Sequence, residues 1–133
     1  MSGSAVALDT NQAIAVLNDA DGAGHWVSGF ATVCLPIPVV GELRYGALNS
    51  RRAAQNVERI EALVTGCTVL EVGLATADVY ARVRTRLKQA GKPIPENDVW
   101  IAALCIQHEL PLATSDAHFG HVEGLHLIGD TSA

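Results

Sequence analysis

Aromatic residues are scarce in this sequence. They make up 5% of its 133 residues, whereas hydrophobic residues as a whole make up 49%. A core of this composition has to be built from Val, Ala, Leu and Ile, which is typical of sheets that helices cover on both faces. The length suits one domain, because a domain near this size buries roughly two-thirds of its unfolded surface. We therefore expect a single α/β domain that spans residues 1–133.

Cysteine and long apolar runs are also scarce. Cys34, Cys67 and Cys105 stand far apart among apolar or small residues, with no CxxC pair and no Cys/His quartet. This pattern favours buried, reduced thiols over a metal or redox site, and it indicates a reducing compartment. The longest apolar run, at 99–106, is far shorter than the roughly 20 residues of a membrane span, and no secretory leader is recognisable. We expect a cytoplasmic protein without membrane contact.

Basic residues are missing from both ends of the chain. All nine Lys and Arg lie between Arg44 and Lys92, and the formal net charge is −5. The field of the whole molecule therefore repels polyanions on average. If the protein binds a nucleic acid, the basic residues between Arg44 and Lys92 would have to make the contacts with its phosphates.

Strand and helix patterns alternate along the chain. Short apolar or β-branched runs predict strands at 4–8, 32–37, 67–72, 111–114 and 125–128. Helical spacing of apolar residues predicts helices at 10–17, 38–49, 53–65, 79–88 and 98–106. The Asp- and Gly-rich stretch 18–24 is expected to be a loop. This alternation implies right-handed crossovers and a mostly parallel sheet.

Four carboxylates fall at one kind of position. Asp9 and Asp116 follow predicted strands, while Glu42 and Asp98 lie in the first turns of predicted helices. In a parallel sheet the strand C-termini and the helix N-termini share one edge, so we expect the four acids to meet there. Each acid alone has an ordinary explanation as a cap, a helix-dipole partner or a turn former. Those explanations do not account for all four acids at one edge.

Four acids at one edge need a cation. Two like charges about 4 Å apart repel by about 4 kcal/mol at an effective dielectric near 20, a large part of a typical stability of about 5–15 kcal/mol. A divalent metal is the simplest partner, and oxygen ligands suit Mg²⁺ or Mn²⁺. Such an ion activates water and stabilises charge on a phosphoryl oxygen, which predicts phosphodiester hydrolysis. Asn11, Thr114 and Ser115 either position the acids and waters or are plain capping and strand-end residues.

Three segments carry a resemblance to a known family. They are LDTNQAI at 8–14, VVGELRYGA at 39–47 and GKPIPENDVWIAALCIQHELPLATSDAHFGHVEGLHL at 91–127. Together they resemble the PIN domain family, in particular the VapC-type toxin ribonucleases of toxin–antitoxin pairs. The resemblance implies a three-layer α/β/α fold with a central, mostly parallel sheet. It also implies that the catalytic and metal-binding residues are Asp9, Glu42, Asp98 and Asp116, with Thr114 and Asn11 beside them.

The same resemblance implies a function and partners. The protein is expected to be a Mg²⁺- or Mn²⁺-dependent endoribonuclease that cleaves RNA, forms a homodimer and is inhibited by a cognate antitoxin. Its acidic charge argues for recognition of a structured RNA loop and against broad RNA affinity. One predicted helix face is basic, and it is either a solvated surface or a contact for RNA, the antitoxin or the second subunit. That face carries Arg82, Arg84, Arg86 and Lys88.

Other functions stay open at this point. A Mg²⁺-dependent phosphatase with Asp9 as nucleophile resembles the haloacid-dehalogenase pattern, but that pattern has a second Asp where this chain has Asn11. A phosphoacceptor receiver domain needs a Lys late in the chain, and the last one here is Lys92. A third alternative is a PIN-like binding module without nuclease activity, and only an activity assay distinguishes it from a ribonuclease. His118 and His121 are expected to serve packing and a turn, not metal binding.

Overall fold

The computed structural model describes residues 4–129. Its centre is a five-stranded sheet with the order β3-β2-β1-β4-β5, in which every neighbouring pair is parallel. The strands are β1 (Ala5–Leu8), β2 (Thr32–Pro36), β3 (Thr68–Leu70), β4 (Leu112–Ala113) and β5 (Leu127–Ile128). The predicted α/β fold with a parallel sheet is confirmed, and the last three strands are shorter than expected.

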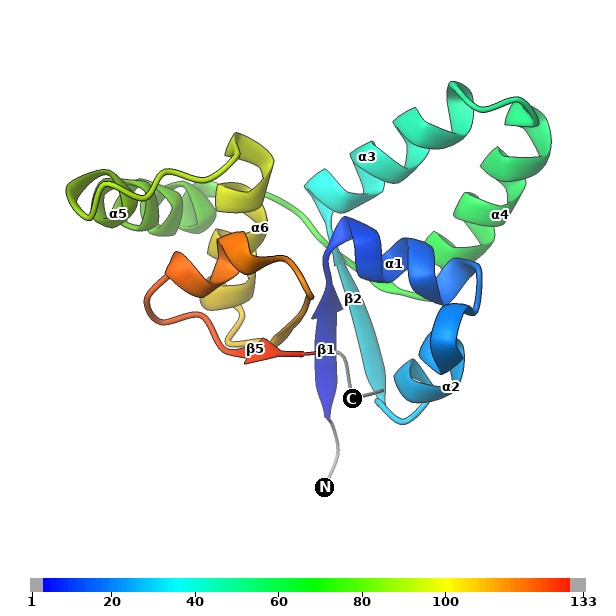
Figure 1. The fold of residues 1–133 in the computed structure, drawn as a ribbon, viewed down its shortest axis with the longest axis horizontal. Helices are drawn as coiled ribbons and strands as arrows, with labels where there is room; N and C mark the ends of the chain where they lie inside the picture. Colours follow the sequence, from blue (N-terminus) through cyan, green and yellow to red (C-terminus); the bar gives the residue numbers. More distant parts are fainter. Residues whose placement is uncertain (1–3, 130–133) are drawn as a thin grey trace.

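Helices cover both faces of this sheet (Figure 1). One layer contains α1 (Thr10–Leu17), α2 (Ala23–Val27), α3 (Ile37–Leu48) and α4 (Ala53–Thr65). The other contains α5 (Leu74–Gln89) and α6 (Glu96–Gln107). Two 3₁₀ turns are η1 (Ala20–Gly22) and η2 (Ala117–His121). The expected three-layer arrangement is therefore present. Among residues 4–129, no helix combines the length and the apolar character needed to cross a membrane.

The core extends from the middle of the sheet into α6. The side chains of β1 from Val6 to Leu8 are fully buried, and so is nearly all of α6 between Ile101 and Cys105. Because α6 is apolar around most of its circumference, it packs between the sheet, α5 and η2. The three cysteines are unpaired; Cys34 and Cys105 are buried, as expected, whereas Cys67 is only partly buried.

The stretch 18–24 is only in part the loop that its composition predicted. Asp19, Asp21 and Gly22 have φ angles of 50°, 49° and 76°, which turn the chain sharply. The Asp19 carboxylate accepts the N–H of Gly24 at 3.1 Å. Helix α2 follows directly, so the Asp and Gly residues that suggested a loop start a short helix.

The strand order reverses between β1 and β4. The chain passes from β1 to β2 and β3 on one side, then returns past β1 to β4 and β5 on the other. In open parallel sheets this reversal leaves a crevice outside the C-terminal ends of the two strands, where ligands bind. Asp9 follows β1 and Thr114 follows β4, so both residues lie at this switch point.

Candidate active site

Asp9 is a buried carboxylate at the start of α1, and its residue is 4% exposed. One of its oxygens, Oδ1, accepts the backbone N–H of Gln12 at 2.8 Å and so caps the helix. Burial raises the pKa of Asp9, hydrogen bonds from Thr114 and Gln12 oppose this, and the charges of Asp116 and Glu42 raise the pKa further. A nearby cation would reverse the net effect.

Thr114 connects the ends of β1 and β4. Its hydroxyl donates to Asp9 Oδ2 at 2.5 Å and accepts the backbone N–H of Asp116 at 2.9 Å. Thr114 is itself buried, so these bonds are sheltered from water. One hydroxyl therefore sets the position of Asp9 relative to Asp116.

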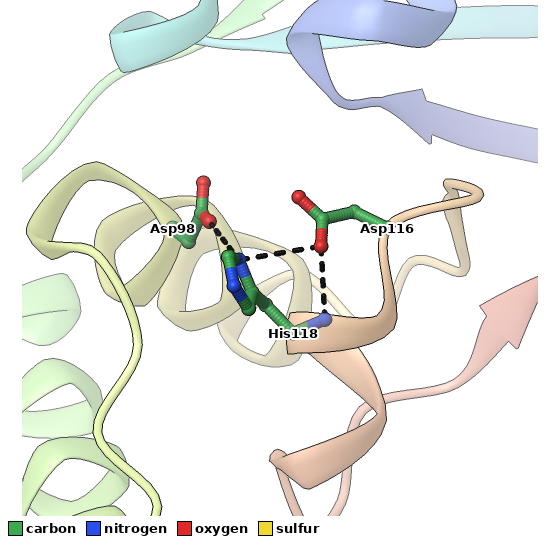
Figure 2. Close-up of side chains that lie close together, drawn as sticks. All are labelled: Asp98, Asp116 and His118. Carbon is green, nitrogen blue, oxygen red and sulfur yellow. Dashed lines mark hydrogen bonds and ion pairs between the residues drawn. The ribbon is translucent and has the colours of Figure 1, made fainter.

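Asp98 and Asp116 lie on either side of His118 (Figure 2). The Nδ1 atom of His118 is 3.2 Å from Asp116 Oδ1 and 3.5 Å from Asp98 Oδ2. One ligand atom from each of the three residues lies within 4.8 Å of the others. Burial and the charge of Asp116 raise the pKa of Asp98, His118 lowers it, and Glu42 raises it again. These three side chains can hold one metal ion.

Glu42 stands at the rim of the site, on α3. It is exposed, and its Oε1 accepts the hydroxyl of Thr10 at 2.5 Å. The charge of Glu42 reaches both Asp9 and Asp98, since it raises the pKa of each. A cavity of about 670 Å³ opens beside it, lined by Thr10, Pro38, Gly41, Glu42, Tyr45 and Asn97.

A sequence model of the PIN domain matches residues 6–125. The chain belongs to the PIN domain family. Among the curated relatives of this PIN domain, ribonuclease VapC5 of Mycobacterium tuberculosis is 31% identical over 94 residues. The aligned part covers 69% of this chain and 70% of that protein.

Solved structures give the same assignment. VapBC2 from Rickettsia felis, bound to a DNA fragment from its promoter, superposes with a TM-score of 0.88 at 25% identity, covering 95% of this chain and 98% of that one. VapBC-5 from Mycobacterium tuberculosis, of the VapBC family of toxin–antitoxin systems, has a TM-score of 0.74 at 29% identity and the same coverage. The resemblance to VapC-type PIN domains is confirmed.

The PIN domain brings the predicted site residues together to different degrees. Asp98 and Asp116 are within reach of a common ion, and Thr114 links Asp9 to them. Glu42 is coupled to them through its charge. Asn11 and Ser115 are exposed, and within residues 4–129 neither makes a side-chain hydrogen bond to the acids. The catalytic roles of these residues stay predictions.

Two polar residues of this PIN domain contact the acids although the sequence pattern did not place them in the site: Thr10, and His118, which was expected to serve only packing and a turn. Thr10 donates to Glu42, and the ring of His118 faces two of the acids. The turn role expected for His118 is real, because its backbone N–H donates to Asp116 Oδ1 at 2.9 Å. The expected packing role belongs to Phe119 instead, because Phe119 is the buried residue of this turn. The His118 ring therefore remains free to face the acids. The spacing of two residues from Asp116 was the available signal.

The donor set fits a divalent cation. Among the ion pairs of residues 4–129, none joins a Lys or Arg to the four acids, and the imidazole of His118 contacts two of them, Asp98 and Asp116. The charges of Asp116 and Glu42 raise the pKa of both Asp9 and Asp98, as uncompensated like charges do. The acidic cluster of this PIN domain can therefore bind a metal ion.

The basic face on α5 is largely paired within the same molecule. Arg82, Arg84 and Arg86 each contact a carboxylate, at 3.0, 3.3 and 3.7 Å. The acids, in the same order, are Asp78, Glu96 and Glu123. All of these groups are well exposed, so each pair contributes little to stability. A solvated surface accounts for these contacts, and a role in binding RNA, antitoxin or a second subunit stays a prediction.

Proposed function

We propose that this PIN domain, taken as one domain over residues 1–133, is a Mg²⁺- or Mn²⁺-dependent endoribonuclease and the toxin of a toxin–antitoxin pair. The observation that carries the proposal is the convergence of Asp98, Asp116 and the Thr114-linked Asp9 at the switch point of the sheet. Its similarity to ribonuclease VapC5 and to the VapBC structures supports RNA as the substrate.

The site residues have distinct tasks in this proposal. Asp9, Glu42, Asp98 and Asp116 would hold the ion. When bound, a divalent metal orients and acidifies the attacking water and stabilises the charge that grows on a phosphoryl oxygen. Gln12 and Thr114 fix the Asp9 carboxylate in advance, through one hydrogen bond to each oxygen.

The protein scaffold keeps the remaining acids in position. Asp98 lies in the first turn of α6, which is buried at Val99 and from Ile101 to Cys105, so its carboxylate is carried by a rigid element. The Thr10 hydroxyl orients Glu42 at the mouth of the adjoining cavity. That cavity is open to solvent, and an RNA strand that entered it would reach Glu42.

The partners belong to the same proposal. We expect a cognate antitoxin to cover the acidic site and a second copy of the chain to form a homodimer. Exposed apolar side chains support a protein partner, since Leu48 is 66% and Leu74 is 92% exposed. Light scattering on the toxin freed of antitoxin should give twice the chain mass, and a monomer at micromolar concentration would contradict the dimer.

The direct test is cleavage of total cellular RNA by the purified toxin in Mg²⁺, in Mn²⁺ and in EDTA. We expect discrete fragments that require metal. Asp98→Asn should slow their formation by more than about 100-fold, because loss of groups that merely support a metal ligand already costs about 10–100-fold. Glu96→Gln is the matched control, since Glu96 lies in the same helical turn but bonds to Tyr80 and Arg84.

Two other outcomes would favour the alternatives. A folded, metal-bound protein that leaves every RNA intact would be a PIN-like binding module. Metal-dependent hydrolysis of a phosphate monoester without RNA cleavage would indicate a phosphatase. The structure offers the phosphatase little support, because Asn11 is exposed on α1 and forms no hydrogen bond with Asp9 among the described residues.

A further inference from the structure

His118 occupies a position that packing alone does not explain. It is the second residue of η2, where Phe119 supplies the buried anchor. Its own side chain is 49% exposed, so the ring had room to point into solvent. Instead, its Nδ1 edge turns inward, between a carboxylate on α6 and a carboxylate after β4 (Figure 2).

The spacing of the three groups is that of ligands around one ion. Ligands that each lie about 2.1 Å from a six-coordinate ion are about 3.0 Å apart when adjacent and about 4.2 Å apart when opposite. The Nδ1 atom of His118 is 3.2 Å from one carboxylate oxygen and 3.5 Å from the other. Figure 2 shows that Asp98 and Asp116 each keep a second oxygen directed away from the ring. A small inward movement of the three groups would therefore complete one face of a coordination sphere.

The backbone holds His118 in place for this role. Its N–H donates to Asp116 Oδ1 at 2.9 Å, which fixes the backbone of His118 relative to that carboxylate. Buried Phe119 anchors the next residue against the core. His121 is the contrasting case, because it lies in the same turn, is exposed, and lines a different cavity with Arg86 and Glu123.

We propose that His118 is a metal ligand through Nδ1, and that this nitrogen makes the site select Mn²⁺ over Mg²⁺. Mg²⁺ takes oxygen ligands and keeps several waters, whereas first-row transition ions also accept imidazole nitrogen. Mn²⁺ is the ion in this series that suits a site made mostly of carboxylates. The inference rests on the proposed function for the existence of the ion, and it assigns to this chain a ligand beyond the four acids.

Pulsed electron paramagnetic resonance on the Mn²⁺-loaded, tag-free full chain tests the bond directly. An imidazole nitrogen bound to Mn²⁺ gives a ¹⁴N modulation. We expect this signal in the wild type and in His121→Asn, and we expect His118→Asn to lose it. His118→Gln serves as a second variant, and circular dichroism checks that each variant folds.

Metal affinity gives an independent readout. Titration of the free Mn²⁺ signal should show at least about tenfold weaker Mn²⁺ binding for His118→Asn, since loss of a ligand should cost no less than loss of its supporting groups. Mg²⁺ affinity, measured by competition, should change much less. The preference for Mn²⁺ should therefore fall in His118→Asn and stay unchanged in His121→Asn.

Several results would overturn the inference. They are failure of Mn²⁺ to bind, a wild-type spectrum without ¹⁴N modulation, a modulation that persists in folded His118→Asn, and an equal loss of Mn²⁺ and Mg²⁺ affinity. The RNA cleavage assay separates this inference from the proposed function. If the wild type cleaves RNA but gives no ¹⁴N signal, His118 is not a ligand and the proposed ribonuclease function still holds. If it gives the ¹⁴N signal but cleaves no RNA, His118 is a ligand and the ribonuclease function is wrong.

Discussion

At the scale of single residues, Thr114 is the polar group on which two of the acids depend. Both Asp9 and the backbone of Asp116 use its hydroxyl, and the group is buried. A buried polar atom that loses its partner costs more than the hydrogen bond itself contributes, because it cannot turn to water. Thr114 thus supports both the stability of the fold and the geometry of the site.

Thr114→Val tests this dependence at nearly constant volume. We expect the free energy of unfolding of the metal-free protein to fall by about 1–3 kcal/mol, since Asp9 Oδ2 and the Asp116 N–H each lose a partner. Urea unfolding followed by circular dichroism measures the change. Thr114→Ser keeps the hydroxyl and should stay close to the wild type. Equal midpoints for Thr114→Val and the wild type would show that neither bond contributes.

Asp98 makes the metal-free fold sensitive to pH. Its pKa is raised in the folded state by burial and by Asp116, so the folded protein binds a proton at Asp98 more readily than the unfolded chain does. The free energy of unfolding therefore falls as the pH rises from the ordinary value of 3.8 through the raised pKa. Above that window the charged carboxylate destabilises the protein unless a cation is bound.

Asp98→Asn removes this penalty. In EDTA at pH 7 we expect the variant to melt at a higher temperature than the wild type, and the difference should shrink as the pH approaches 3.8. Added Mn²⁺ should raise the melting temperature of the wild type and have little effect on the variant. Thermal melts across this pH range decide the matter. A variant that melts lower than the wild type at pH 7 in EDTA would contradict a repulsive cluster.

At the scale of elements, α6 carries a site carboxylate in its first turn and apolar residues along the rest of its length. Asp98 in its first turn has a side chain that is 18% exposed, while Ile101 and Cys105 are buried. Burial raises the pKa of the Cys105 thiol to about 12. The eight apolar residues that follow Asp98 thus anchor α6 in the core. The Asp98 carboxylate can therefore move far only if the whole helix moves.

Thiol labelling measures how firmly α6 is held. With a pKa of about 12, Cys105 is ~0.01% thiolate at pH 8, so we expect it to react with a thiol reagent only on unfolding. Cys67 is partly exposed and should react first. Absorbance of the released product gives the rates, and mass spectrometry assigns the sites. Rapid labelling of Cys105 in the native protein would mean that α6 opens.

Elements with a strong periodic pattern could be predicted from the sequence. The strand at 4–8, the helix at 53–65 and the buried helix after Asp98 follow from the spacing of their apolar residues. Helix α2 could not be predicted, because it depends on the left-handed backbone of Asp19 and Asp21. The short length of β4 could not be predicted either, since the strand ends at Ala113 and the next residue, Thr114, uses its side chain to bond to Asp9.

The candidate site shows the same division. Parallel strands place the residues after β1 and β4 at one edge, so the meeting of Asp9 and Asp116 could be deduced from element order. The inward orientation of His118 could not, because it depends on how α6 packs beside η2. Likewise, the bond from Thr10 to Glu42 requires the packing of α1 against α3.

At the scale of the whole molecule, the basic side chains lie in one segment of the chain, and several of them are already bonded to other groups of the protein. The basic residues all lie within 44–92, and several bond to groups of the same chain. Arg44 forms two bonds with Glu61, and Arg59 bonds to the Leu17 carbonyl and to Asn18. With a net charge of −5, the chain has few cations to spare for phosphates.

RNA affinity should therefore depend only weakly on salt. If about two or three phosphates are neutralised, log K against log[salt] has a slope of about −1.4 to −2.1 for single-stranded RNA. Filter binding of the cleavage-deficient Asp98→Asn variant to its mapped target in increasing KCl gives this slope. A slope of about −5 or steeper would contradict the expected scarcity of phosphate contacts.

The hydrogen bond from Thr114, after β4, to Asp9, after β1, also determines when the site can form during synthesis of the chain. Asp9 precedes Thr114 by 105 residues, so it is synthesised well before Thr114, Asp116 and His118. A nascent chain that has not yet released β4 from the ribosome lacks the hydroxyl that fixes Asp9 and two of the groups that face Asp98. The acidic site therefore stays incomplete from the synthesis of Asp9 until β4 and the residues that follow it have joined the sheet.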